Sequence, residues 1–343
     1  MVNLSRRSLL AALAGSAFLP SACTTFETRD LVTLRCDPAL PLTRLAMGSC
    51  LRQNRRQPVW KTIRAAKPNL FIHLGDNVYA DTYSAAQMRA AYARLLEHTG
   101  YQALRRQVPV IATWDDHDYG WNNSGAEYSM KRDARQIFCD FFGESPTSPR
   151  RRQLDGIYTS YLYGPPGQRT QIILLDGRYE RTDTRMLGEL QWQWLESELR
   201  KPAEFRLIAS GSRVVAEGVG IEEAWENIPD ERMRLFALIE NTKAEGVMFL
   251  SGDPHYSDYA MINDGVPYPF WDMTSSSLNQ SSHKARINKR RLVGGYFRPN
   301  FGMIMIDWAG EGTTIKLETR SSGGKIVLSH SIPLGTLRRR AAV

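Results

Sequence analysis

No stretch of about 18 consecutive apolar residues occurs in this chain, so no membrane-spanning helix is expected in the mature protein. The sequence also lacks an internal repeat, a low-complexity segment and a polar linker long enough to separate two domains. What it has instead is 343 residues with a hydrophobic fraction of 42% and a charged fraction of 23%, which are globular values.

Cysteine is scarce. Four are present, and at most three remain in the mature body: Cys36, Cys50 and Cys139. An oxidising compartment would permit one disulfide, and Cys36–Cys139 is a pairing that spacing alone leaves open. The Gly-x-Ser-x-Gly elbow is also missing, which argues against a serine hydrolase built on Ser212 or on a serine within 275–277.

Negative charge is in the minority, because the net charge is +8. This excess favours anionic partners such as phosphate esters, nucleic acid or anionic lipid surfaces, without choosing among them. Arginine-rich clusters occur at 150–152, 289–291 and 338–340. We expect them to be solvated surface.

The first 23 residues predict an export signal rather than folded structure. Arg6 and Arg7 precede a small apolar run over 9–19, and Pro20-Ser21-Ala22-Cys23 follows. The arginine pair resembles a twin-arginine signal, which exports folded proteins and suits a protein that loads metal before export. Cys23 resembles a lipoprotein acceptor, although Pro20 is a poor match, so lipid attachment stays open. The expected location is the periplasm or cell envelope.

Strand-like and helical patterns alternate along the rest of the chain and predict a layered α/β domain. An N-terminal segment over 24–44 leads into it. Helices are expected over 58–66, 84–106, 126–142, 188–199 and 229–242. Strands are expected over 45–50, 70–74, 108–113, 157–163, 170–175, 205–209, 247–250, 302–307, 313–318 and 325–330, with 157–163 and 170–175 forming a hairpin.

Three of these strands end in side chains of the kinds that can bind metals. The three segments are Gly75-Asp76-Asn77-Val78-Tyr79, Trp114-Asp115-Asp116-His117-Asp118 and Ser251-Gly252-Asp253-Pro254-His255. The carboxyl ends of parallel strands meet at one sheet edge, and carboxylates crowded there need a counter-charge. A helix cap at Asp76 or a solvated acidic loop would explain one segment, but three favour a cation site. Cys50 ends another strand and either enters the same crevice or is a small buried hydrophobe.

A pair of metal ions about 3.5–4 Å apart clamps a phosphate and generates hydroxide near neutral pH. Asp76 is suited to bridge two ions. A histidine near the leaving oxygen can supply its proton or stabilise its charge. The residues therefore point to phosphoester hydrolysis.

The three segments resemble, in order and spacing, motif blocks of the PhoD-like alkaline phosphatases. These belong to the calcineurin-like metallophosphatase superfamily and are related to purple acid phosphatases. Further similar stretches are Gly48-Ser49-Cys50, Asp176-Gly177-Arg178-Tyr179, 187–195, 225–232 and Asn300-Phe301-Gly302. The resemblance covers about 45–308 and implies a four-layer αββα sandwich, expected as one domain over 45–343.

The resemblance also implies two metal ions, Fe(III) with Ca(II) or another divalent ion. It assigns the first ion to Cys50, Asp76, Tyr79 and His255, and the second to Asp76, Asp116 and Asp253. Thiolate and phenolate suit ferric iron, and carboxylates suit calcium. Asp81 and Asp115 are expected to shape the turns rather than touch a metal.

By the same resemblance, His117 and Arg178 are the expected catalytic residues. His117 would face the phosphate or the leaving group, with Asp118 orienting it. Arg178 and Arg213 are expected to bind substrate phosphate, since a guanidinium fits phosphate oxygens. Arg213 stands where close relatives would have a glutamine-containing element. Whether Arg52, Arg55 and Arg56 lie near the mouth of the site is left open.

The expected function is an exported metal-dependent phosphoesterase that hydrolyses phosphate mono- or diesters through a metal-bound hydroxide. Expected partners are a phosphate-ester substrate, the twin-arginine export machinery and, through a lipid on Cys23, the membrane; no specific nucleic-acid partner is expected. The alternative is a non-catalytic envelope lipoprotein that retains the fold. The intact set of motif residues argues against it.

Overall fold

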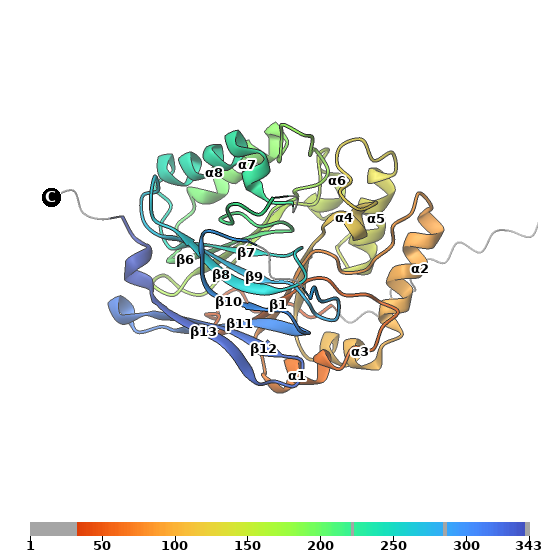
Figure 1. The fold of residues 1–343 in the computed structure, drawn as a ribbon, viewed down its shortest axis with the longest axis horizontal. Coiled ribbons are helices and arrows are strands. Elements are labelled where there is room, and N and C mark those ends of the chain that lie inside the picture. The colour runs from red at the N-terminus through yellow and green to blue at the C-terminus, as the bar shows by residue number, and fades with distance from the viewer. Residues whose placement is uncertain (1–32, 221–222, 284–286, 340–343) are drawn as a thin grey trace, which may run out of the picture.

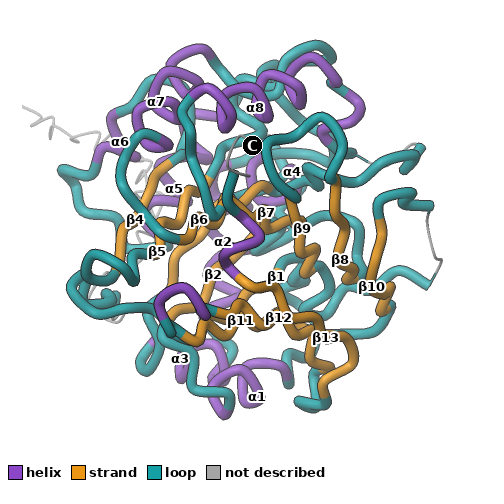
Figure 2. The backbone as a smooth tube through the Cα atoms, turned by 90° about the vertical axis from the view of Figure 1, so that its left-hand side faces the viewer, coloured by secondary structure: helices purple, strands orange, loops and turns teal. Residues whose placement is uncertain are grey.

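The computed structural model describes residues 33–220, 223–283 and 287–339. Two β-sheets lie face to face, with helices on both outer sides, so the chain forms the expected four layers (Figure 2). The predicted export signal over 1–23 and residues 24–32 of the segment that follows it lie outside the described residues. Within the described ranges, no helix is both long and apolar enough to cross a membrane.

The first sheet has the strand order β13-β12-β11-β1-β2-β3. Its strands are β1 (Arg44–Gly48), β2 (Leu70–Leu74), β3 (Val110–Thr113), β11 (Asn300–Asp307), β12 (Thr314–Ser321) and β13 (Ile326–Pro333). β1, β2 and β3 run parallel, whereas β11 pairs antiparallel with β1 and begins an antiparallel run. The carboxyl ends of β1, β2 and β3 therefore meet at one edge.

The second sheet has the order β10-β8-β9-β7-β6-β5-β4. Its strands are β4 (Thr159–Tyr163), β5 (Thr170–Leu174), β6 (Phe205–Ser210), β7 (Val247–Ser251), β8 (Ser257–Ile262), β9 (Phe270–Ser275) and β10 (Arg291–Tyr296). β5, β6, β7 and β9 are parallel neighbours. β4 and β5 form the expected antiparallel hairpin.

Helices cover the outer faces of both sheets (Figure 1). The α-helices are α1 (Val59–Ala65), α2 (Ala85–Leu96), α3 (Thr99–Arg105), α4 (Asp116–Tyr119), α5 (Lys131–Phe141), α6 (Pro149–Arg152), α7 (Glu189–Leu199) and α8 (Pro229–Asn241). Short 3-10 turns are η1 (Trp225–Asn227), η2 (Gly310–Gly312) and η3 (Leu334–Leu337). α7 and α8 lie on the second sheet, and α1 and α3 lie below the first.

The central strands of the first sheet are buried on both faces. Along β2, Leu70, Ile72 and Leu74 belong to the core between the sheets, while Phe71 belongs to the core under the helices. Successive side chains of a strand point to opposite faces, so an almost continuous apolar run is what a doubly covered parallel strand requires. β2 is thereby anchored in two hydrophobic cores.

Several expectations about single elements were wrong. The helix expected over 84–106 is two helices, because His98 has an extended backbone between α2 and α3. β8, β9 and β10 were not expected. Arg150 is not solvated surface: it is buried, and it binds Glu144 (2.8 Å) and the carbonyl oxygen of Ala112 (2.7 Å).

The cysteine pairing left open by the sequence is not formed here. Cys36, Cys50 and Cys139 are free thiols. Cys36 donates to the carbonyl oxygen of Asn69 (3.4 Å), and Cys139 donates to that of Arg150 (3.9 Å).

Candidate functional site

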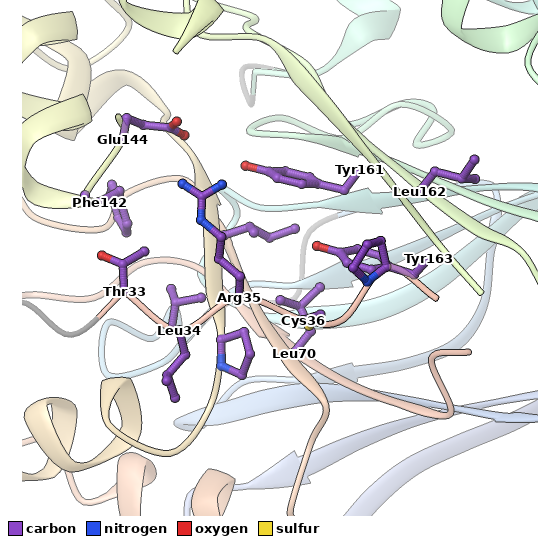
Figure 3. Close-up of a pocket in the computed structure, with 15 residues that line it drawn as sticks. Thr33, Leu34, Arg35, Cys36, Leu70, Phe142, Glu144, Tyr161, Leu162 and Tyr163 are labelled. Carbon is purple, nitrogen blue, oxygen red and sulfur yellow. The ribbon is translucent and has the colours of Figure 1, made fainter. Parts of the chain in front are cut away.

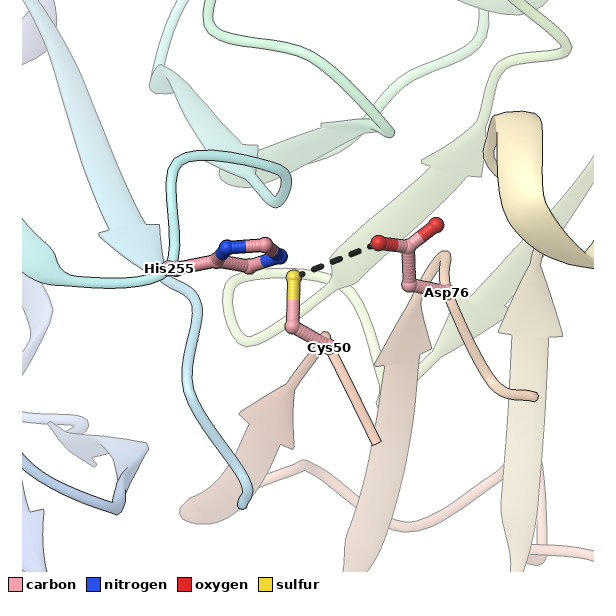
Figure 4. A group of neighbouring side chains, drawn as sticks. All are labelled: Cys50, Asp76 and His255. Atoms are coloured by element: carbon pink, nitrogen blue, oxygen red, sulfur yellow. Dashed lines mark hydrogen bonds between the residues drawn. The ribbon is translucent and has the colours of Figure 1, made fainter. Parts of the chain in front are cut away.

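The predicted metal ligands gather where the carboxyl ends of the two sheets meet. Cys50 follows β1, Asp76 follows β2, and Asp116 begins α4 just after β3. His255 reaches the same point on a loop after β7 of the second sheet (Figure 4). Residues far apart in the sequence are therefore brought together by topology.

Cys50, Asp76 and His255 form a first cluster whose ligand atoms all lie within 4.8 Å of one another. The Cys50 thiol lies 3.5 Å from Asp76 Oδ2 (Figure 4). Tyr79 completes the group, because its hydroxyl is 3.0 Å from Asp76 Oδ2 and 2.9 Å from His255 Nε2. A thiol, a phenol, an imidazole and a carboxylate thus converge on one point.

Asp76, Asp116 and His117 form a second cluster, again with ligand atoms within 4.8 Å of one another. Asp76 belongs to both clusters, so one buried carboxylate joins two groups of donors. Asp116 Oδ2 is fixed by the backbone N–H of Asn123 at 2.7 Å. Asp253, which follows β7, is not among these grouped donors, but its backbone carbonyl oxygen accepts the Cys50 thiol at 3.5 Å. Burial, followed by Asp115 and Asp116, raises the pKa of Asp253 well above its usual range.

The backbone at the strand ends is strained. Positive φ angles occur at Cys50 (60°), Asp76 (50°), Asp253 (78°) and His255 (62°). Non-glycine residues in this region cost about 1–3 kcal/mol each, and such residues cluster at functional sites. Four of the residues predicted as ligands share this strain, which indicates that the fold holds them for a purpose other than stability.

The donor set also fits a cation electrostatically. Asp76 Oδ1 and Asp116 Oδ1 are buried and accept no hydrogen bond from any described residue. Burial, followed by the neighbouring Asp116 and Asp115, raises the pKa of Asp76 well above its usual range. Burial, followed by Asp76, likewise raises the pKa of the Cys50 thiol. A cation between these groups would favour their ionised forms and lower the pKa of both Asp76 and Cys50.

His117 is oriented by Asp81, whose Oδ1 lies 2.6 Å from His117 Nδ1. Burial opposes protonation, but the hydrogen bond with Asp81 and the charge of Asp116 outweigh it and raise the pKa of His117. Because Nδ1 of His117 contacts Asp81, Nε2 is the His117 nitrogen that remains for the cluster with Asp76 and Asp116. The sequence had given this orienting role to Asp118 and had given Asp81 only a turn.

Asp118 instead ties the strand-end turns to each other. Its Oδ1 accepts the backbone N–H groups of Asp76 (3.1 Å) and Asp115 (2.8 Å), and its Oδ2 accepts that of Asn77 (3.3 Å). Burial raises the pKa of Asp118 to about 7. Asp118 does not reach His117 because it stands three residues after Asp115, the residue that caps the N-terminus of α4. At this position its carboxylate folds back and binds the N–H of the capping residue.

Arg178 is buried behind the cluster rather than open to a substrate. Its Nε donates to Asp115 Oδ1 (2.6 Å), its Nη2 binds Glu223, and the same nitrogen lies 3.8 Å from Asp116 Oδ1. Burial opposes ionisation of Asp116, yet Arg178 and His117 outweigh it and lower the pKa of Asp116. Arg178 therefore keeps that carboxylate charged and in place.

Arg213, the other arginine expected at the substrate, is fully buried. Its Nη1 donates to the hydroxyl of Tyr256 at 2.7 Å, and its guanidinium lies 5.5 Å from the centre of that ring. Its backbone pairs with Ala224 in an isolated bridge. These contacts make Arg213 a support for the loops of the second sheet.

Sequence reasoning missed several residues that support the site. Ser276 holds Cys50 through an Oγ–Sγ contact of 3.0 Å and accepts the backbone N–H of His255 at 2.8 Å. Gln53 binds both the N–H (2.9 Å) and the carbonyl oxygen (3.0 Å) of Tyr79. Gln53 lies three residues after Cys50, and Ser276 belongs to the serine run over 275–277, but neither position predicted a supporting role.

A separate cavity of about 280 Å³ lies at the opposite edge, near the start of β2 and β3 (Figure 3). Arg35 and Cys36 line it on one side, and Tyr161 and Tyr163 line it on the other. It holds none of the predicted ligands. The cavity is therefore not part of the metal centre.

Comparison with known proteins agrees with this geometry. Among solved structures, the fold is similar to one described as PhoD, with a TM-score of 0.71, 17% identity, and coverage of 89% of this chain and 72% of that one. It is also similar to a purple acid phosphatase from yellow lupin (Lupinus luteus) seeds, with a TM-score of 0.65, 15% identity, and coverage of 86% and 54%. A dimetal phosphatase from Danio rerio matches with a TM-score of 0.51, 14% identity, and coverage of 86% and 99%.

At these identities the solved structures establish the fold alone. No curated protein sequence matches this chain. The sequence model of the PhoD-like phosphatases, however, matches residues 45–300, which hold all the predicted metal ligands. The chain therefore belongs to the PhoD-like phosphatase family, whose members are phosphoric ester hydrolases.

Proposed function

We propose that this protein hydrolyses phosphate mono- or diesters at a site for two metal ions. The observation that carries the proposal is the position of Asp76, a buried carboxylate common to two clusters of donors. Cys50, Asp76, Tyr79 and His255 would hold the first ion. Asp76, Asp116 and Asp253 would hold the second.

The chemistry of the donors favours two different ions. Thiolate and phenolate ligands suit ferric iron, whereas a set of carboxylates suits calcium or a similar hard ion. When bound, such a pair of ions lowers the pKa of a water molecule towards neutrality and offsets the charge of the phosphate.

The protein's own residues would manage the leaving group and the charge of the site. His117, protonated with the help of Asp81, would give a proton from Nε2 to the leaving oxygen. Arg178 keeps Asp115 and Asp116 in position from behind. We propose this positioning role for Arg178 in place of direct contact with substrate, because the side chain is enclosed by carboxylates.

We further propose that the protein acts outside the cytoplasm, in the periplasm or cell envelope. Support comes from Arg6 and Arg7 before an apolar run, and from Cys23 as a possible lipid acceptor. Export in the folded state would allow the metals to be loaded beforehand. Labelling with a radioactive fatty acid, compared between wild type and Cys23→Ala, tests the lipid attachment.

Replacement of the shared carboxylate tests the function. Asp76→Ala removes a donor from both clusters, so we expect turnover of an aryl phosphate to fall by about 10³-fold or more. Bound metal should fall as well, measured by elemental analysis of the same preparations. Bis-aryl phosphate assayed in parallel separates diesterase from monoesterase activity.

The matched control is Asp307→Ala, at an exposed position at the end of β11. It should keep both metal and turnover. Full activity in Asp76→Ala would refute the site assignment. A wild-type protein that binds metal and hydrolyses neither ester would support the alternative of a non-catalytic envelope protein.

A further inference from the structure

Two arginines on the loop that follows Cys50 converge on one amide oxygen. Arg52 Nε donates to Gln280 Oε1 over 3.1 Å, and Arg55 Nη1 donates to the same oxygen over 2.5 Å. The loop is tied to the metal centre at its start, because the N–H of Leu51 donates to the carbonyl oxygen of Asp76 at 2.9 Å. The pair therefore lies at the rim of the site.

Arg52 lies directly against a predicted metal ligand. Its guanidinium carbon is 4.2 Å from the centre of the Tyr79 ring, whose hydroxyl contacts Asp76. Asn279 fixes the backbone of Arg52 on both sides: it accepts the N–H (2.7 Å) and donates to the carbonyl oxygen (2.9 Å). A cation is thus held in place before any ligand binds, which reduces the entropy lost on binding.

Neither arginine is neutralised by an acid. Across the described ranges, no carboxylate forms an ion pair with Arg52 or Arg55. Both guanidinium groups donate instead to the neutral side chain of Gln280. The guanidinium of Arg178, by contrast, forms ion pairs with Asp115 and Glu223. Two guanidinium groups drawn to one neutral oxygen repel each other, and a bound anion removes that repulsion.

We propose that Arg52 and Arg55 form an anion subsite beside the metal centre. This inference rests on the proposed function. The subsite binds a second anionic group, a carboxylate or a phosphate, carried by the leaving group of the phosphoester. Arg52 is half-buried next to Tyr79 and Arg55 is exposed, so the bound group lies between the metal centre and solvent. Phosphoesters with a second negative charge are the preferred substrates.

The test compares two aryl phosphates that differ in the para substituent, a carboxylate in one and a carboxamide in the other. With the metal-loaded full chain, we expect Arg52→Gln and Arg55→Gln each to lower kcat/KM for the carboxylate ester about 10-fold, mainly through KM. Hydrolysis of the carboxamide ester should change less than about twofold. Arg56→Gln, on the same loop and exposed, should alter neither.

A second variant leaves both arginines intact. Gln280→Glu puts a carboxylate where the proposed anion binds, so the preference for the charged ester should disappear while the carboxamide ester is hydrolysed as before. This variant should be at least as stable as wild type to heat. Its result therefore does not depend on whether the arginine variants fold.

Equal losses on both esters in Arg52→Gln would show that Arg52 acts through Tyr79, and would overturn the subsite. So would an unchanged preference in Gln280→Glu. If the metal-loaded wild type hydrolyses neither ester, the proposed function fails, and the subsite is tested by calorimetry with the corresponding phosphonates. We then expect about 10-fold tighter binding of the carboxylate compound by wild type than by Arg52→Gln; equal affinities would overturn it.

Discussion

At the scale of single residues, the site depends on carboxylates with different partners. Among the residues that the structure describes, nothing donates a hydrogen bond to one buried oxygen of Asp76 and one of Asp116, as expected of metal ligands. Both carboxylate oxygens of Asp118 accept hydrogen bonds from backbone N–H groups, and Asp81 contacts the imidazole of His117. Aspartate side chains thus fasten a turn, orient a histidine or keep an oxygen available to a metal ion, depending on their neighbours.

The contact between Asp81 and His117 gives a pH prediction. Because Asp81 raises the pKa of His117, Asp81→Asn should lower that pKa. If protonated His117 serves the leaving group, the alkaline limb of the pH–rate profile moves to lower pH. Turnover should fall about 10–100-fold, measured as kcat/KM from pH 5 to 9.

Metal content separates positioning from ligation in this experiment. Asp81→Asn should retain the metal, since Asp81 is not among the grouped donors. Asp81→Glu keeps the charge and should recover part of the activity. An unchanged pH profile in Asp81→Asn would mean that Asp81 only shapes the turn.

At the scale of elements, the ends of β1, β2, β3 and β7 build the site. The turn after β2 packs closely against the turn after β3. Gly75 has φ +96°, and a Cβ there would lie 2.5 Å from Cβ of Asp115. Only glycine allows the turn that bears Asp76 to pack against the turn that bears Asp116.

Gly75→Ala should therefore disturb the site as well as the fold. We expect a loss of about 2–4 kcal/mol in the free energy of unfolding, from the positive φ and the overlap together, with loss of bound metal. Urea denaturation and elemental analysis measure the two effects. Gly167→Ala is the matched control, because its φ is +90° with nothing within 4 Å, so it should cost about 1 kcal/mol and keep the metal. Similar losses in both variants would contradict the packing argument.

Elements with one simple pattern were predictable from the sequence. β2 is an apolar run before Gly75, and α7 buries Trp192, Leu195 and Leu199 at helical spacing. Of the site, the sequence pointed to the strand-end acids and to Cys50. The structure brings Cys50, Asp76 and Asp116 together at one edge.

Other elements were hidden by buried polar residues. β9 contains Asp272, which accepts Ser251 Oγ at 2.7 Å and the N–H of Val214 at 2.9 Å. β8 contains Asp258, paired with Arg291 at 2.6 Å. A charged residue inside a strand breaks the apolar pattern, and its partner lies too far along the chain to be inferred. For the same reason, the roles of Asp81 and Arg178 required the structure.

At the scale of the whole molecule, stability should depend on pH through a group outside the site. His73 on β2 is buried among aromatic rings, with Nε2 3.1 Å from the Tyr101 hydroxyl. Burial lowers the pKa of His73 to about 3 from 6.5. The unfolded chain therefore binds a proton below pH 6.5 that the folded chain does not, so stability falls as the pH drops from 6.5 towards 3.

The size of this effect follows from linkage. Between pH 7 and pH 5, His73 should cost the fold about 2 kcal/mol. In His73→Gln, whose stability at pH 7 is expected to be lower, the further loss on going to pH 5 should be smaller than in wild type by about that amount. Urea denaturation at both pH values measures it. Identical losses in the two proteins would show that His73 does not titrate in this range.

The pairing of β1 with β11 also sets the order in which the protein can be completed. Ala46 lies opposite Met303, so the strand that leads to Cys50 pairs early with β2 but gains its second neighbour, β11, only after β4 to β10 have been synthesised. His255 and Ser276, which hold Cys50 from the other sheet, are also late in the chain. A nascent chain on the ribosome thus has the first ligands but no finished pocket. Metal binding should therefore require β11, and a chain truncated before β11 should remain without metal.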